Sequence, residues 1–245
     1  MHSSIYEKRF RLGTSECDIN GAWKLASLIE AINNTSNEWS KSLRLWHLDL
    51  QDKNVTWVLF RSELQVDRYP QLGEEVTVKV YSTKMRAMFY PRYCLIVDEE
   101  GNTAAKASSL LLLIDRDTRK VVSPSERGIE IPEPADGDKP LQLSIERRAV
   151  QGEQSSSLYQ TQYTDFDVNG HVNNARYIDW MCNAMGIERM KRFEITSASM
   201  DFKHEIVVGD MVEHTLTLDG TAFSFSGSVR EQQMFQIAGS FRPRV

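Results

Sequence analysis

The sequence predicts an α+β protein made of two similar units, each an antiparallel sheet that wraps around one long helix. Two observations support this prediction. Both halves of the 245-residue chain show the same order of one strand-like run, one helical segment and four further strand-like runs. Short runs also recur: Asp-Ile-Asn-Gly-Ala at 18–22 matches Asp-Val-Asn-Gly-His at 167–171, and Gly-Glu-Glu-Val at 73–76 matches Gly-Asp-Met-Val at 209–212. Because the matches fall at equivalent places in the two halves, we interpret them as an internal duplication.

The first half begins with a strand-like run at 6–12, and a segment follows in which apolar residues recur at helical spacing. These residues are Ala22, Leu25, Ala26, Leu28, Ile29 and Ile32. Runs typical of strands then occur at 56–66, 75–81, 89–97 and 104–114, and turn-forming residues separate them. We therefore expect one strand, one helix with a buried face, and four more strands.

The second half repeats this order. A strand-like run at 156–163 precedes a helical segment that contains Tyr177, Ile178, Met181 and Met185. Strand-like runs follow at 193–202, 211–218, 222–229 and 234–241. Between the halves, residues 116–154 are rich in Pro, Asp, Glu, Gly and Ser, which is typical of a connecting segment. We predict an N-terminal unit at 1–120, a linker at 121–154 and a C-terminal unit at 155–245.

A long helix followed by an antiparallel meander is the hotdog arrangement. Hotdog units usually pair, so we expect the two sheets to pack together as a pseudo-dimer that covers edges which would otherwise be exposed. The fused pair could satisfy this need for a partner, or it could form a further homodimer.

Composition and charge exclude several classes of function. A net charge of −5 and a pI near 5.6 argue against a nucleic-acid-binding role driven by the field of the whole protein. The three cysteines, Cys17, Cys94 and Cys182, are widely spaced and match no metal-ligand pattern, so reduced thiols are expected. No apolar stretch approaches the roughly 20 residues that span a bilayer, and the N-terminus has no apolar core of a signal peptide. We expect a cytoplasmic protein without a metal, a cofactor or a membrane partner.

Three polar residues just before the second helix are the candidate active site. Asp167, Asn169 and His171 occupy alternate positions, which would place their side chains on one side of an extended segment. The unpaired N–H groups at the start of the following helix could bind an oxygen that carries negative charge. Such a cluster suits acyl transfer, in which a carbonyl becomes an oxyanion.

Helix capping is the alternative role for this cluster, because Asp and Asn side chains often accept backbone N–H bonds at a helix start. Capping gives no reason for His171. The earlier copy of the run keeps Asp18 and Asn20 but has Ala22 in place of the histidine. We infer that the Asp and Asn positions are structural in both copies, whereas the imidazole belongs to the chemistry of the second.

The extended motif resembles the signature of the acyl-acyl-carrier-protein (acyl-ACP) thioesterases of plant plastids and bacteria. It reads Asp167-x-Asn169-x-His171-Val172-Asn173-Asn174-x-x-Tyr177-Ile178. The first half is similar to the same family in order and spacing, through Trp57-Val58-Leu59-x-Arg61, Val66-Asp67-Arg68-Tyr69-Pro70, Gly73, Met85-Arg86 and Ala107-Ser108-Ser109. The resemblance covers nearly the whole chain.

The resemblance implies hydrolysis of fatty acyl-ACP thioesters to free fatty acid and carrier thiol, with no cofactor. It places Asp167, Asn169 and His171 in the catalytic group and adds Glu205 from a later strand. The family often has Cys after this Glu; here the residue is Ile206, which rules out a thiol nucleophile at that position. Asp167 would activate water or attack the thioester itself. The expected substrate-binding residues are Met85, Arg86, Met88, Asn173 and Asn174.

Some assignments keep an alternative. Strand alternation alone would make Glu205 a solvated charge unless a bulge turned it toward His171. Basic residues could meet an acidic carrier protein or simply be solvated: Lys84, Arg86, Arg92, Arg116, Arg119 and Lys120. Two other classes also remain, a hotdog acyl-thioester hydratase or dehydratase and a non-catalytic acyl-binding module.

Overall fold

The computed structural model describes residues 5–85, 87–131, 139, 141–142 and 150–244. Its strands form one ten-stranded antiparallel sheet in the order β1-β3-β4-β5-β2-β7-β10-β9-β8-β6. The first half comprises β1 (Ile5–Arg11), α1 (Leu25–Ser42), β2 (Val55–Val66), β3 (Glu75–Ser82), β4 (Phe89–Val97) and β5 (Thr103–Asp115). The second comprises β6 (Glu153–Gln160), α2 (Asn174–Met185), α3 (Ile187–Arg192), β7 (Phe193–Phe202), β8 (Met211–Asp219), β9 (Ala222–Val229) and β10 (Gln232–Pro243). The predicted order of one strand, one helix and four strands is therefore confirmed in the first half, and the second half follows it with the short helix α3 added after α2.

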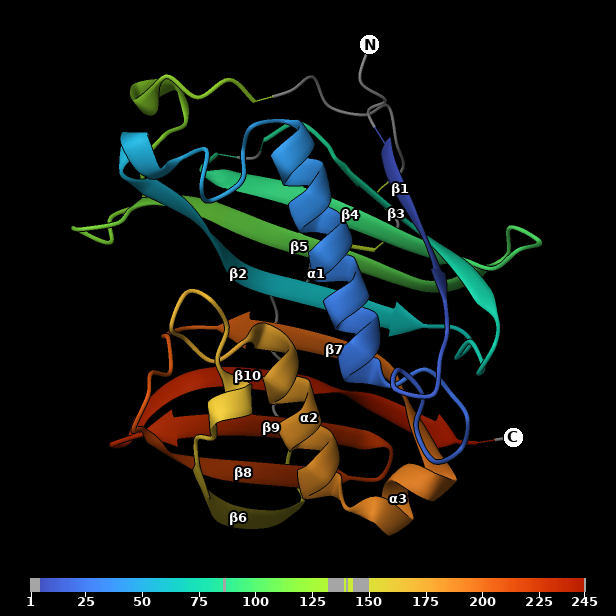
Figure 1. Cartoon of the computed structure of the whole chain (residues 1–245). Helices are drawn as coiled ribbons and strands as arrows, with labels where there is room; N and C mark the ends of the chain where they lie inside the picture. The colour runs from blue at the N-terminus through green and yellow to red at the C-terminus, as the bar shows by residue number, and fades with distance from the viewer. Residues whose placement is uncertain (1–4, 86, 132–138, 140, 143–149, 245) are drawn as a thin grey trace.

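The two halves meet edge to edge. Counted outward from the centre, the first half runs β2, β5, β4, β3, β1 and the second runs β7, β10, β9, β8, β6, which is the same order in each. Antiparallel pairing of β2 with β7 joins them into one continuous sheet. In Figure 1, α1 and α2 lie on the same face of this sheet. The two sheets thus share strand edges rather than packing face to face, because backbone hydrogen bonds satisfy both inner edges at once.

Local sequence explains where the helices start and end. α1 begins at Leu25 rather than at Ala22, because residues 18–23 form a turn in which the Gly21 N–H donates to the Asp18 carbonyl at 3.0 Å. α2 begins after Asn173, whose side chain accepts from the Ala175 N–H at 2.9 Å. Its buried face packs with that of α1 over the sheet in one hydrophobic core, as the periodicity predicts.

A second, smaller core closes the far end of the first half. Leu45, Leu50 and Val55 pack there with Leu113 of β5 and with Ile129. Ile129 belongs to the segment expected as a linker, so the beginning of that segment packs against the first half. In the part of the chain that the structure describes, no helix has the length and apolar character needed to cross a membrane.

A buried ion pair lies at one end of the β2–β7 pairing. Arg61 and Asp201 are register partners, and Arg61 Nε lies 2.6 Å from Asp201 Oδ1. Both residues are only 7% exposed. Two positions along, the Ser199 hydroxyl donates to Glu63 Oε1 at 2.8 Å. Burial raises the pKa of Glu63. These polar contacts fix the register, because any slip would leave buried charges unpaired.

Asp201→Asn should lower the free energy of unfolding by about 3–5 kcal/mol, because Arg61 would remain buried without its carboxylate. Urea denaturation measures this loss. Glu75→Gln is the matched control, since it removes a carboxylate from a surface pair with Arg9 whose N–O distance is 3.7 Å. The control should lose less than about 1 kcal/mol. Equal losses in the two variants would show that the buried Arg61–Asp201 pair does not hold the halves together.

The second half also buries a histidine. His214 is 5% exposed and its ring lies near those of Tyr159, Trp180 and Phe225. Burial lowers the pKa of His214 to about 4. The folded protein therefore holds the neutral ring at pH values where an unfolded histidine, with a pKa near 6.5, binds a proton.

This difference predicts acid sensitivity. As the pH falls from 6.5 toward 4, His214 binds a proton in the unfolded chain but stays neutral in the folded chain. The free energy of unfolding therefore decreases as the pH falls. The loss that comes from His214 should be about 2 kcal/mol between pH 7 and pH 5. Urea denaturation at the two pH values checks it, with His214→Phe as the variant that retains an aromatic ring. An unchanged pH dependence in His214→Phe would contradict the prediction.

Candidate active site

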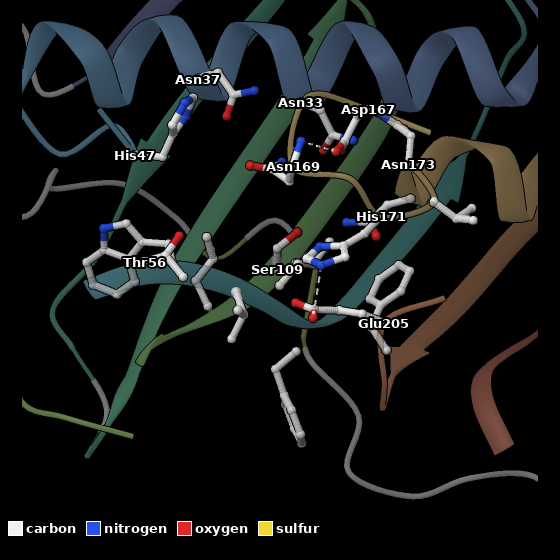
Figure 2. Close-up of a pocket in the computed structure, with 18 of the residues that line it drawn as sticks. Asn33, Asn37, His47, Thr56, Ser109, Asp167, Asn169, His171, Asn173 and Glu205 are labelled. Atoms are coloured by element: carbon white, nitrogen blue, oxygen red, sulfur yellow. Dashed lines mark hydrogen bonds and ion pairs between the residues drawn. The ribbon is translucent and has the colours of Figure 1, made fainter. Parts of the chain in front are cut away.

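The Asp-Asn-His run forms a tight turn rather than an extended segment. The Gly170 N–H donates to the Asp167 carbonyl at 3.0 Å, and the Asp167 N–H donates to the His171 carbonyl at 3.0 Å. Gly170 adopts a φ of +77°, which favours glycine. Asp167 Oδ1 accepts from the Asn169 N–H at 2.8 Å. The turn places the side chains of Asp167, Asn169 and His171 along one cleft (Figure 2).

Glu205 reaches the imidazole of this turn. Its Oε2 lies 3.3 Å from His171 Nε2, the contact drawn in Figure 2. Simple alternation along β7 would have made Glu205 a solvated charge. However, β7 ends at Phe202, and the next two backbone N–H groups both donate to the Met234 carbonyl, at 2.9 and 3.1 Å. The chain therefore bends as the sequence argument required, and alternation no longer fixes the direction of Glu205.

The first half contains the same backbone turn. The Gly21 N–H donates to the Asp18 carbonyl at 3.0 Å, and the Asp18 N–H donates to the Ala22 carbonyl at 2.8 Å. Asp18 Oδ1 accepts from the Asn20 N–H at 2.8 Å. Gly21 also adopts a φ of +77°. The Asp-x-Asn-Gly part of the motif is thus a structural turn in both halves, as the sequence comparison indicated.

The two turns differ in the residues that occupy the positions of His171 and Glu205. Ala22 occupies the position of His171. The Trp23 N–H donates to the Pro70 carbonyl at 2.8 Å, and the Val172 N–H donates to the Ile206 carbonyl at 3.0 Å. Pro70 therefore corresponds to Ile206, and the residue before Pro70 corresponds to Glu205. That residue is Tyr69. The imidazole–carboxylate pair is therefore present in the second turn and replaced by alanine and tyrosine in the first.

The second turn opens into a large cleft of about 2080 Å³. Its walls come from α1, β2 and β5 of the first half and from residues 163–174 and 202–208 of the second. Asn33 and Asn37 project from α1 toward the turn in Figure 2. Apolar side chains also line the cleft, including Ile32, Leu59, Leu111, Phe202 and Met234. A smaller cavity under α1, lined by Leu64 and Met200, extends across the β2–β7 pairing.

The expected substrate-binding residues divide into two groups. Asn173 and Asn174 line the cleft beside His171, and Asn173 also caps α2. Met85 and Met88 lie in the connection from β3 to β4 and do not line it. Arg86 lies outside the described residues.

Two of the basic residues make specific contacts that the sequence did not predict. Arg119 forms an ion pair with Glu205, on the carboxylate oxygen that does not face His171. Arg92 is not a solvated charge: it lies under α1, where its Nη2 donates to Ser40 Oγ at 3.0 Å. Burial lowers the pKa of Arg92 to about 10.

Two further reactive groups at the cleft, the Tyr177 hydroxyl and the Cys94 thiol, are held protonated. Tyr177 lines it, and the pKa of its hydroxyl is raised, first by burial and then by the charges of Glu205 and Asp167. Cys94 also lines the cleft, and burial raises the pKa of its thiol, so it is a poor nucleophile. Within the described residues, no group of three or more His, Cys, Asp or Glu side chains could hold a metal ion. Asp167 and His171 are the carboxylate and the imidazole that the turn itself presents to the cleft, which His47, His204 and Glu205 also line.

Comparison with known proteins identifies the family of the chain. The family model of the acyl-ACP thioesterase N-terminal domain matches residues 3–128, and that of the acyl-ACP thioesterase C-terminal domain matches residues 148–240. The chain belongs to the acyl-ACP thioesterase family, as the motif resemblance indicated.

Individual relatives are distant in sequence but alike in fold. A chloroplastic palmitoyl-acyl carrier protein thioesterase of Arabidopsis thaliana is 28% identical over 160 residues, which cover 62% of this chain and 39% of that protein. The chain spans about half the length of the curated relatives it matches. The 12:0-ACP thioesterase structure from Umbellularia californica has a TM-score of 0.85 at 18% identity, covering 100% of this chain and 99% of that one. An acyl-ACP thioesterase structure from Bacteroides thetaiotaomicron has a TM-score of 0.80 at 22% identity and covers 98% of both chains.

Proposed function

We propose that this protein hydrolyses fatty acyl-ACP thioesters to free fatty acid and carrier thiol. The observation that carries the proposal is the His171–Glu205 pair, which stands at the cleft in the second half and has no counterpart in the first. A structural turn needs neither residue, because the first half makes the same turn without them. Family membership supplies the substrate class.

The geometry supports distinct roles for the polar side chains. Glu205 fixes one ring nitrogen of His171, which leaves the imidazole oriented to protonate the departing thiolate. Asp167 supplies the carboxylate that activates water or attacks the carbonyl carbon, and Asn169 positions the reacting groups or binds the oxyanion. In the complete reaction, water provides the hydroxyl group of the fatty acid and the proton of the thiol.

We further infer a division of labour between the halves. Residues 1–120 would hold the acyl chain between α1 and the sheet, residues 155–245 would supply the catalytic group, and residues 121–154 would connect them. The cleft walls support this division, because α1, β2 and β5 line it opposite the catalytic turn. The joined halves would act as a pseudo-dimer, and a further homodimer stays a prediction.

Release of free thiol should be observed when the protein is incubated with a ladder of acyl-ACP substrates and detected with a chromogenic disulfide. A hydratase or dehydratase would leave the thioester intact, and a binding module would retain the acyl carrier unchanged. Acyl-CoA substrates of the same chain lengths are the control for carrier preference. Absence of thiol release with every chain length would overturn the proposed function.

His171→Ala and Asp167→Asn should each lower kcat/KM by about 10²–10⁴-fold, because each removes a group that moves a proton or attacks the thioester. The matched control is Asp18→Asn, which makes the same change in the turn of the first half. It should retain activity within about twofold and lose only stability, since Asp18 makes a structural turn and pairs with Arg244. Wild-type rates in His171→Ala or Asp167→Asn would show that the site is wrongly assigned.

A further inference from the structure

Resting on the proposed function, we propose that Arg119 is a positioning residue of the active site. It holds the Glu205 carboxylate from the opposite half of the molecule and, through that carboxylate, the imidazole of His171. From the sequence alone, Arg119 is predicted only to contact the carrier protein or to be a solvated charge.

Each oxygen of the Glu205 carboxylate has its own partner. Oε1 pairs with Arg119 Nη2, and Oε2 lies 3.3 Å from His171 Nε2. A carboxylate held at one oxygen can rotate about its side chain, whereas one held at both has a defined plane. The plane of the carboxylate in turn sets the direction of the imidazole. Arg119 comes from the loop after β5, so the first half completes a site that the second half carries.

The loop that carries Arg119 is firmly built. Asp115, at the end of β5, accepts from the Thr118 N–H at 2.9 Å and from its hydroxyl at 3.0 Å, and Arg127 Nη2 lies 2.6 Å from its other oxygen. These hydrogen bonds to Thr118, followed by Arg127, lower the pKa of Asp115. Arg119 itself adopts a φ of +58°, a conformation uncommon for residues other than glycine. The surrounding hydrogen bonds therefore hold a strained backbone that presents Arg119 to Glu205.

An arginine of the second half also reaches across to the first half, although it occupies a different register position from Arg119. β10 corresponds to β5, and Arg244 follows it directly. Arg244 Nη2 lies 2.8 Å from Asp18 Oδ2, in the turn of the first half. In both directions, an arginine after the last strand of one half contacts the other half: Arg244 pairs with the Asp-Asn turn itself, whereas Arg119 pairs with Glu205, which contacts His171 of that turn. The first contact is structural, because that turn has no imidazole; the Arg119 contact reaches the catalytic pair.

The ion pair contributes little to stability. The side chains of Arg119 and Glu205 are 48% and 38% exposed, and pairs of this kind stabilise a protein by about 0–1 kcal/mol. Variants at position 119 should therefore fold, and the effect of losing the guanidinium should fall on the geometry of the site.

The test compares Arg119→Ala, Arg119→Lys, Glu205→Gln and the double variant Arg119→Ala/Glu205→Gln in an acyl-ACP thiol-release assay. Arg119→Ala should lower kcat about 10- to 100-fold with KM nearly unchanged, as expected for a misplaced catalytic group. Arg119→Lys should retain an intermediate kcat, and added guanidinium ion should partly restore Arg119→Ala. The double variant should be no slower than Glu205→Gln, because both changes break the same linkage from Arg119 through Glu205 to His171.

The control is Lys79→Gln. Lys79 lies on β3, away from the cleft, and the change removes the positive charge of its surface pair with Glu7 of β1. Its kcat and KM should equal those of the wild type. A second readout does not depend on catalysis: the ring resonances of His171 in NMR spectra, assigned by their loss in His171→Ala, should shift in Arg119→Ala and stay unchanged in Lys79→Gln.

Several outcomes would overturn the inference. A raised KM with unchanged kcat in Arg119→Ala would make Arg119 a carrier contact, and multiplicative losses in the double variant would make it independent of Glu205. Unchanged His171 resonances in Arg119→Ala would also contradict it. Failure of the proposed function looks different, because the wild type would then release no thiol even where the His171 resonances shift as expected.

Discussion

The antiparallel pairing of β2 with β7 organises the whole molecule. It turns two small sheets into one, and its buried Arg61–Asp201 pair fixes the register between them. Glu205 leaves the sheet just beyond the end of β7, while the cleft is walled by β2 and β5 on the other side. A shift in this register would therefore displace the Asp167–His171 turn relative to the groove that we assign to the acyl chain.

Duplication explains why one turn is free for chemistry. In the first half, the residues that correspond to the site bind the second half instead. Asp18 pairs with Arg244, Asn20 Nδ2 donates to the Met190 carbonyl at 3.3 Å, and the hydroxyl of Tyr69 donates to the Ile195 carbonyl at 2.9 Å. One copy of the turn thus stabilises the contact between the halves. The other copy faces an open cleft, where an imidazole and a carboxylate can reach a substrate.

Sequence patterns predicted the local features of this structure and missed those made by distant segments. Periodicity identified the strands and helices, and the motif placed Asp167, Asn169 and His171 at one cleft, although by a turn rather than an extended run. The edge-to-edge pairing of the sheets, the bend that aims Glu205 and the burial of Arg92 were not predictable. Each depends on contacts between residues far apart in the chain, which alternation and composition do not encode. Arg119 in particular looked like one charge among several.

A partly exposed ion pair can matter for catalysis even where it matters little for folding. Its contribution to stability is small because water competes for both partners and ordering two long side chains costs entropy. Under the proposed function, catalysis depends on a different quantity, the fraction of time in which the His171 imidazole points at the reacting sulfur. Glu205 stands just beyond the end of β7, outside the regular sheet pairing, whereas Arg119 stands on a loop fixed by Asp115. In the proposed arrangement this loop therefore constrains the Glu205 carboxylate, and it does so from the half of the protein that carries no imidazole in its own turn.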